Sequence, residues 1–264
     1  MTGHSASCPL WLQQRFEQSG GSVPFSQFMA WALHDPEYGA YGSGHLKIGK
    51  EGDFVTSTTR GPDFSALMGC QLVQWLRTLA LNHPTKTLSI VEVGPGEAEL
   101  SCDLIDHLVE QLPDLIHRLE LVLVETNPGM EQRQRKRLEQ HQSSHESQQR
   151  LPHRWTSLSN LKTCPVIGVL IAHELLDAFA VERLVLNDGR LRRQIVQLQQ
   201  GSDGEKRLHW GTEPIPQELQ ERMDATLSAT QIALPPEDAE DGWTTEWHDE
   251  CADWFAEASE AFIA

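Results

Sequence analysis

Continuous apolar runs alternate with amphipathic segments in the middle of the chain. Three of these runs read LSIVEV (88–93), LELVLVE (119–125) and VIGVLIA (166–172). Segments with the apolar spacing of a helix lie between them, at 98–112 and 128–140. Strands that are apolar along their whole length are typical of a parallel sheet covered by helices on both faces. The pattern therefore predicts an α/β protein with a parallel-sheet core.

Helices and a loop are predicted before this core. Apolar residues at helical spacing indicate helices at 7–18, from Ser26 to Asp35, and at about 63–80. The segment between the last two is rich in Gly and Thr and is typical of a loop. We expect residues 1–82 to form an N-terminal helical and loop extension.

The pattern changes again after residue 180. Asp188-Gly189 separates two strand-like segments and favours a tight hairpin turn. The last segment, HDECADWFAEASEAFIA, has the spacing of an amphipathic helix. We expect residues 83–264 to form the Rossmann-like core, with a β-hairpin inserted at about 181–212.

Two predicted strands end in residues suited to ligand binding, since parallel sheets bind ligands at the carboxyl ends of their strands. Gly94-Pro95-Gly96 follows Glu92, and glycines let a ligand approach the backbone before a helix N-terminus. Glu125 ends the next strand, where a carboxylate can bind a ribose diol. Each signal alone is also consistent with a tight turn or an exposed carboxylate. Together they favour a ribose-containing cofactor.

The charge of the loop distinguishes the candidate cofactors. Glu97 and Glu99 lie at the start of the predicted helix, and Glu92 lies just before the loop. Three carboxylates would repel a diphosphate, which favours a helix N-terminus without nearby negative charge. S-adenosyl-L-methionine has a ribose, a sulfonium and an amino group but no phosphate. The loop therefore favours this cofactor over NAD or ATP.

A third polar group, in AHELLDAF (172–179), follows the last apolar strand. Glu174 and Asp177 are three residues apart, so on a helical turn they share a face and can bind a guanidinium or accept a proton. We take His173, Glu174 and Asp177 as candidate catalytic residues. A structural alternative has Asp177 capping a helix and Glu174 exposed. A zinc helix would need a second His where Asp177 stands, so no metal is expected.

Composition excludes some classes of protein. The 264 residues carry a net charge of −17, to which residues 237–260 contribute ten acidic side chains and no Lys or Arg. Such a chain is a poor nucleic-acid binder, because phosphate contacts need cations. The one basic cluster fits a solvated helix face better than a binding patch, and it comprises Arg133, Arg135, Lys136 and Arg137.

Cysteine use and hydropathy indicate the compartment. The five cysteines are scattered and none lies in a CxxC pair, which is typical of reduced thiols. No apolar run reaches the roughly 18 residues of a membrane span, and the N-terminus does not resemble a signal peptide. We expect a cytoplasmic protein without membrane insertion.

Four motifs occur in an order that resembles one protein family. They are PFSQFMAWALHDPEYGAYG, EGDFVTS, VEVGPG and HELLDAFAVERL. The chain is similar over most of residues 22–186 to the MidA-like family of S-adenosylmethionine-dependent methyltransferases. That family includes the mitochondrial complex I assembly factor, a protein-arginine methyltransferase. The resemblance implies a class I methyltransferase fold with the cofactor at Glu92, Gly94, Gly96 and Glu125.

The resemblance also implies roles outside the core motifs. Gly52, Asp53 and Thr56 would lie over the cofactor, so that the N-terminal extension covers the site. Glu174 and Asp177 would line the substrate side, with Glu174 orienting an arginine. The expected partner is a protein substrate, with a complex I-type subunit as one candidate.

The chain departs from the family pattern in several places. The family loop reads GPGRGTL, whereas Glu97, Ala98 and Glu99 stand here, and His173 replaces an Asn. Family members also continue into further strands, so the resemblance implies a chain without the family's C-terminal third and an incomplete sheet. A second hypothesis is therefore a catalytically impaired assembly or binding module with the same fold. A nucleotide-dependent oxidoreductase is a third.

Overall fold

The computed structural model describes residues 8–43, 62–143 and 150–263. The chain divides into two compact units, one of residues 1–32 and 179–250 and one of residues 33–178 and 251–264. This division differs from the expected boundary between residues 82 and 83. The first helix and strand of the chain pack with strands after residue 180, and so they group with that part. The expectation that residues 1–82 cover a cofactor stays a prediction.

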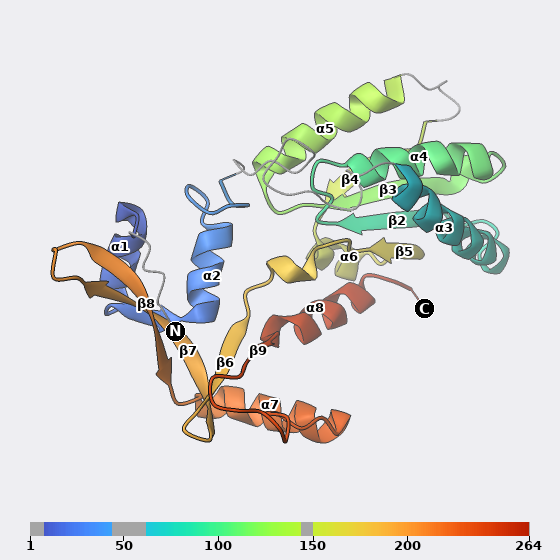
Figure 1. Cartoon of the computed structure of the whole chain (residues 1–264). Helices are drawn as coiled ribbons and strands as arrows, with labels where there is room; N and C mark the ends of the chain where they lie inside the picture. Colours follow the sequence, from blue (N-terminus) through green and yellow to red (C-terminus); the bar gives the residue numbers. More distant parts are fainter. Residues whose placement is uncertain (1–7, 44–61, 144–149, 264) are drawn as a thin grey trace. The chain divides into compact units, whose positions relative to one another are not determined.

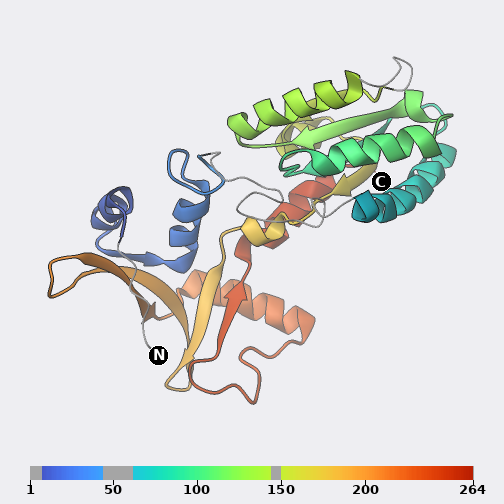
Figure 2. The same cartoon turned by 45° about the horizontal axis from the view of Figure 1, so that its top comes forward.

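The larger unit contains a four-stranded sheet in which all strands are parallel (Figures 1 and 2). The strand order is β4-β3-β2-β5, and the bounds are β2 Leu88–Val93, β3 Leu119–Val124, β4 His153–Thr156 and β5 Gly168–Ile171. All six residues of β2 are buried, as a central strand with both faces covered requires. The parallel α/β core predicted from the apolar runs is confirmed.

Helices pack on both faces of this sheet. Leu88 and Ile90 belong to one apolar cluster with residues of α3, α4 and α5, whereas Val91 and Val93 belong to another with α6 and the chain end. This alternation follows from the period of two along a strand. The helices are α3 Pro62–Asn82, α4 Glu99–Gln111, α5 Pro128–Ser143, α6 Leu158–Thr163 and α8 Asp249–Glu260, with short 3-10 turns η2 Ile116–Arg118 and η4 Leu176–Ala178.

The other unit is built on an antiparallel sheet. Its strand order is β1-β7-β6-β9, with β8 also paired to β7. Asp188 and Gly189 have φ values of 51° and 68°, and they form the tight turn between β6 and β7 that the sequence predicted. The strands are β1 Ser22–Pro24, β6 Glu182–Asn187, β7 Arg190–Gln200, β8 Lys206–Glu213 and β9 Thr244–Trp247, and the helices are α1 Leu10–Gln18, α2 Phe25–His34 and α7 Gln217–Thr230.

Candidate functional site

A cavity of about 480 Å³ opens at the carboxyl ends of the parallel strands. Its walls come from the segments after β2, β3 and β5 and from residues 34–42. Seven predicted site residues line it: Glu92, Gly94, Gly96, Glu125, His173, Glu174 and Asp177. The other three, Gly52, Asp53 and Thr56, lie outside the described residues. The fold thus gathers residues that are up to 85 positions apart in the sequence, because parallel strands end at one edge of the sheet.

The loop after β2 has a backbone that only small residues suit. Gly94 and Gly96 have φ values of 66° and 54°, in the left-handed region that favours glycine. A Cβ on Gly94 would lie 2.7 Å from Leu175 Cδ1. Ala98 also has a positive φ, 59°, although it carries a side chain. The glycines therefore shape the cavity wall and leave backbone open to a ligand.

Glu92 is buried beneath this loop. It is 3% exposed, and the Ser101 hydroxyl donates a hydrogen bond to its Oε2. Burial raises the pKa of Glu92 to about 7, and the bond from Ser101 opposes that rise. Near neutral pH the side chain is thus divided between its charged and neutral forms.

Glu125 has a carboxylate held from two sides. Its Oε1 accepts a hydrogen bond from the Asn127 backbone N–H at 2.8 Å. Its Oε2 accepts one from Gln134 Nε2, also at 2.8 Å. Each carboxylate oxygen can accept more than one hydrogen bond, so the two oxygens of Glu125 can still accept hydrogen bonds from a ribose diol.

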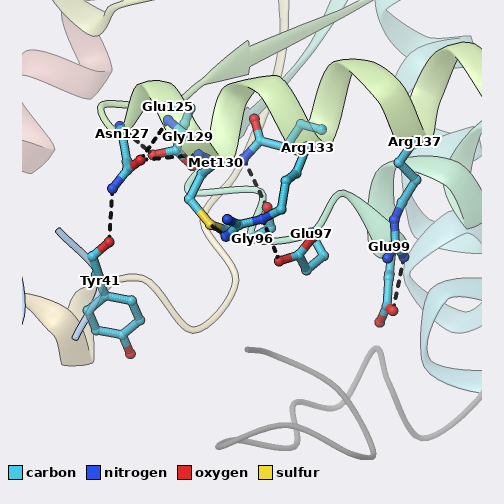
Figure 3. A network of polar contacts seen from close by, with 11 residues as sticks. Tyr41, Gly96, Glu97, Glu99, Glu125, Asn127, Gly129, Met130, Arg133 and Arg137 are labelled. Carbon is cyan, nitrogen blue, oxygen red and sulfur yellow. Dashed lines mark hydrogen bonds and ion pairs between the residues drawn. The ribbon is translucent and has the colours of Figure 1, made fainter. Parts of the chain in front are cut away.

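Glu97 of the loop and Glu99, the first residue of α4, are paired with arginines of α5 (Figure 3). Glu97 Oε1 lies 3.1 Å from Arg133 Nε, and Glu99 Oε1 lies 3.0 Å from Arg137 Nη1. The three carboxylates are therefore not three free negative charges, as the sequence argument against a phosphate ligand assumed. That argument is weakened, because the positive charges of two arginines, 36 and 38 residues further along the chain, offset the negative charges of Glu97 and Glu99.

The basic cluster has a structural role that the sequence did not indicate. Arg133 and Arg137 hold the loop, while Arg135 pairs with Glu131 and lies 4.0 Å from the ring centre of Trp155. These three arginines are thus in ion pairs within the chain, and the simple reading of a solvated helix face is incomplete.

The third predicted group reaches the cavity by a different geometry from the expected one. Asp177 lies in the 3-10 turn η4, but Glu174 precedes that turn and has a φ of 50°. The two carboxylates therefore do not share a face of one helical turn, although both line the cavity and are exposed. His173 packs against Phe64 of α3, with ring centres 4.8 Å apart.

Other residues reach the site without a clear sequence signal. His34 and Tyr41 line the cavity and stack with ring centres 6.1 Å apart, and His34 Nε2 lies 2.9 Å from the Ala178 carbonyl oxygen. Burial, and then the charges of Asp177 and Glu174, raise the pKa of Tyr41. Both residues fall within the first family motif, but nothing in their spacing identified them.

Asn127 fastens this N-terminal segment to the end of β3. Its Nδ2 donates to the carbonyl oxygen of Tyr41 at 2.9 Å (Figure 3). The same group donates to the carbonyl oxygen of Gly42 at 2.8 Å. Its Oδ1 accepts from the N–H groups of Gly129 and Met130 and so caps α5. The sequence signal for the cap, Asn before Pro, was available, whereas the tether depends on the fold.

The cavity suits a cofactor that contains a ribose. The loop with Gly94 and Gly96 forms one wall, and a fixed carboxylate lies just after the neighbouring strand. Among the described residues no cluster of His, Cys, Asp and Glu has the geometry of a metal site. The architecture and this site define the class I methyltransferase fold.

Comparisons with known proteins agree with this class. Residues 67–263 match a family model described as "Putative S-adenosyl-L-methionine-dependent methyltransferase". The chain belongs to this family, whose cofactor is S-adenosyl-L-methionine. A solved structure from Burkholderia thailandensis, bound to S-adenosyl-homocysteine, is similar with a TM-score of 0.72. It is 23% identical and matches 94% of this chain and 57% of its own length, which supports the fold.

Curated relatives carry a more specific name. Protein arginine methyltransferase NDUFAF7 homolog, mitochondrial, from Drosophila melanogaster, is 30% identical over 198 residues, which is 70% of this chain and 44% of the relative. The Xenopus tropicalis NDUFAF7 protein is 33% identical over 115 residues, or 37% of this chain and 26% of the relative. The chain spans less than half the length of these relatives.

These names correct one expectation. The relatives are named as mitochondrial proteins, so the cytoplasmic location expected from the cysteines is wrong. Scattered thiols indicate only a reducing environment, and they do not distinguish one such compartment from another. In the part of the chain that the structure describes, no helix has both the length and the apolar character to cross a membrane.

Proposed function

We propose that this chain binds S-adenosyl-L-methionine in the cavity at the ends of β2 and β3 and methylates a protein arginine side chain. One observation carries the proposal: the glycine loop, the fixed carboxylate of Glu125 and the two carboxylates Glu174 and Asp177 line a single cavity. The names of the relatives support arginine as the acceptor.

The residues present have distinct tasks in this proposal. Glu125 binds the ribose, and the backbone at Gly94 and Gly96 makes room for the rest of the cofactor. When bound, the cofactor would supply a methyl group on a sulfonium sulfur, and this sulfur would leave as the neutral thioether of S-adenosyl-homocysteine. The protein contributes mainly by holding the acceptor nitrogen in line with that methyl group.

Glu174 and Asp177 would act on the acceptor. A guanidinium is planar and cationic, and a carboxylate can bind it through two parallel hydrogen bonds. The nitrogen that gains a methyl group must lose a proton, which one of these carboxylates can accept. Tyr41 lines the same cavity, near enough to Glu174 and Asp177 for their charges to raise its pKa, and its ring would limit the width of the acceptor side.

Calorimetric titration with S-adenosyl-L-methionine, followed by transfer of a labelled methyl group to arginine-containing protein, tests the proposal. Glu125→Gln should weaken cofactor binding, whereas Glu174→Gln and Asp177→Asn should leave binding within about twofold and reduce transfer at least about tenfold. Cofactor binding without transfer by the wild-type chain would favour the alternative, a binding module that retains the fold. No cofactor binding to folded protein would overturn the proposal.

We also propose a complex I-type subunit as the acceptor, on the family resemblance described above. Incubating separated complex I subunits with the protein and labelled cofactor should label arginine in one of them. The same preparation with Glu174→Gln provides the matched control. Label distributed equally over all subunits, or over none, would contradict this acceptor.

A further inference from the structure

Gln134 is a polar residue on the inward face of α5. Gln134, Leu138 and Gln142 are the buried residues of this helix, at intervals of four, so two of its three inward positions are glutamines. Gln134 is 0% exposed. A buried amide is unfavourable unless its hydrogen-bonding groups are satisfied, so its partners indicate why it is there.

Every hydrogen-bonding group of the Gln134 amide has a partner. Nε2 donates to the Gly96 carbonyl oxygen at 2.9 Å and to Glu125 Oε2 at 2.8 Å. Oε1 accepts from the indole N–H of Trp155 at 2.9 Å. A flipped amide would face two acceptors with its oxygen and the indole donor with its NH₂ group. The three partners therefore fix one orientation of the amide.

The partners belong to different walls of the cavity. Gly96 lies in the loop after β2, and Glu125 directly follows β3, so one amide nitrogen joins the two groups assigned to the cofactor. The backbone N–H of Asn127 holds the other oxygen of the same carboxylate at 2.8 Å. Between them, Gln134 and Asn127 leave the Glu125 carboxylate little rotational freedom.

We propose that Gln134 is a positioning residue for the cofactor, which fixes the glycine loop and the Glu125 carboxylate relative to each other before the cofactor binds. The inference rests on the proposed function, since it takes Gly96 and Glu125 as cofactor-binding groups. A preorganised carboxylate binds more tightly than a mobile one, because its conformational entropy is already lost in the free protein.

The same helix provides a matched control. Gln142 is also buried, 5% exposed, but it accepts from the Leu151 N–H at 2.8 Å and lies 3.0 Å from His153 Nδ1. It supports the chain at β4 and contacts neither Gly96 nor Glu125. Gln134→Met and Gln142→Met each remove a buried amide from α5 and keep a similar side-chain volume. Both should lower the unfolding midpoint.

Calorimetric titration with S-adenosyl-homocysteine separates the two variants. Gln134→Met should raise Kd about tenfold, the expected size for losing a hydrogen bond to a charged group, whereas Gln142→Met should stay within about twofold of wild type. A double-mutant cycle with Glu125→Gln tests whether Gln134 affects cofactor binding through the Glu125 carboxylate. The double variant should bind about as weakly as Glu125→Gln alone, because Gln134 acts through that carboxylate.

Gln134→Glu covers the case in which the methionine variant does not fold. It keeps the volume and the acceptor for Trp155, but places an oxygen against Gly96 and Glu125. The affinity of this variant for S-adenosyl-homocysteine should rise as the pH falls, because the introduced carboxyl group, once protonated, can donate a hydrogen bond to one of these acceptors. The comparison is with the wild-type Kd at the same pH, because Glu92 also titrates near pH 7 at this cavity.

The outcomes distinguish the two proposals. If the wild-type protein does not bind S-adenosyl-homocysteine, both fail. If it binds, and Gln134→Met binds equally well or loses no more than Gln142→Met, the positioning role alone is overturned. Additive effects of Gln134→Met and Glu125→Gln would also overturn it.

Discussion

The guanidinium of Arg133 pairs with the carboxylate of Glu97, with Nε and Oε1 3.1 Å apart (Figure 3). The two side chains come from α5 and from the loop after β2, and the pair cancels a negative charge beside the cavity. Arg137 does the same for Glu99. Because both pairs are part-exposed, their main effect is on the charge that a ligand meets, and their contribution to stability is small.

Breaking the Arg133 pair should therefore change the discrimination between charged and neutral ligands. Arg133→Gln leaves the negative charge of Glu97 uncompensated, which should favour the ligand with a sulfonium. The Kd of S-adenosyl-homocysteine divided by that of S-adenosyl-L-methionine should therefore be about two- to fivefold larger than in wild type. Glu97→Gln should shift the ratio of the two Kd values in the opposite direction. Arg135→Gln is the control, because Arg135 pairs with Glu131 on its own helix. Equal ratios in all variants, at low salt, would contradict this prediction.

Glu92 should make the stability of the protein fall as the pH rises. The unfolded side chain releases its proton near its ordinary pKa of 4.5, whereas the folded one keeps it up to about 7. Between these values the folded state binds more protons, so stability decreases with pH across this window. The loss is complete about one pH unit above 7 and amounts to roughly 3 kcal/mol.

Glu92→Gln tests this dependence. The measurement is the unfolding free energy of the variant minus that of wild type, from denaturant unfolding without cofactor. This difference should be more favourable to the variant at pH 8 than at pH 5. The comparison between pH values is informative even if the amide packs less well, because that cost does not depend on pH. A difference between the two proteins that stays constant from pH 5 to pH 8 would show that Glu92 titrates normally.

Gly94 should tolerate a side chain less well than a glycine of the same conformation elsewhere. Gly94 and Gly189 have φ values of 66° and 68°, but only Gly94 has a close neighbour, Leu175, where a Cβ would lie. Gly189→Ala should cost about 1 kcal/mol of unfolding free energy from backbone strain alone. Gly94→Ala should cost more and also weaken cofactor binding. Equal unfolding costs would mean that Leu175 moves aside freely.

Asn127 should show separable capping and tethering roles. Asn127→Asp keeps an acceptor for the Gly129 and Met130 N–H groups but loses the donor to the Tyr41 and Gly42 carbonyl oxygens. Hydrogen exchange at the Tyr41 and Gly42 amides, which bond to the Leu33 carbonyl oxygen, should become faster in this variant. Asn127→Ala should add a loss of about 1 kcal/mol from the missing cap. Unchanged exchange in Asn127→Asp would show that the tether does not hold this turn.

Local sequence patterns predicted three of the four strands of the parallel sheet, but not β4, whose sequence HRWT contains no apolar run. Strands β2 and β3 are mostly apolar, and the loop after β2 carries the glycines that its left-handed backbone requires. Asp188-Gly189 likewise specified its turn. These features depend on residues that are neighbours in the chain, so their physical requirements appear directly in the sequence.

The division into units depended on contacts that the sequence does not display. Strand β1 lies near the N-terminus and pairs with β7, about 170 residues later. No local pattern reports such a pairing, because a short strand has the same appearance whichever partner it meets. The boundary expected between residues 82 and 83 differed from the observed division for this reason.

The sequence by itself determined the parallel α/β core, the glycine loop, and the set of strand ends at which a cofactor site had to lie. Only the tertiary structure decided the charges and the supports of that site. It paired Glu97 and Glu99 with arginines of α5, placed Glu92 out of water, and brought Gln134 between Gly96 and Glu125. The physical reason is that solvation and partnership depend on groups distant in the chain, and a polar helix such as α5 does not indicate which of its glutamines is buried.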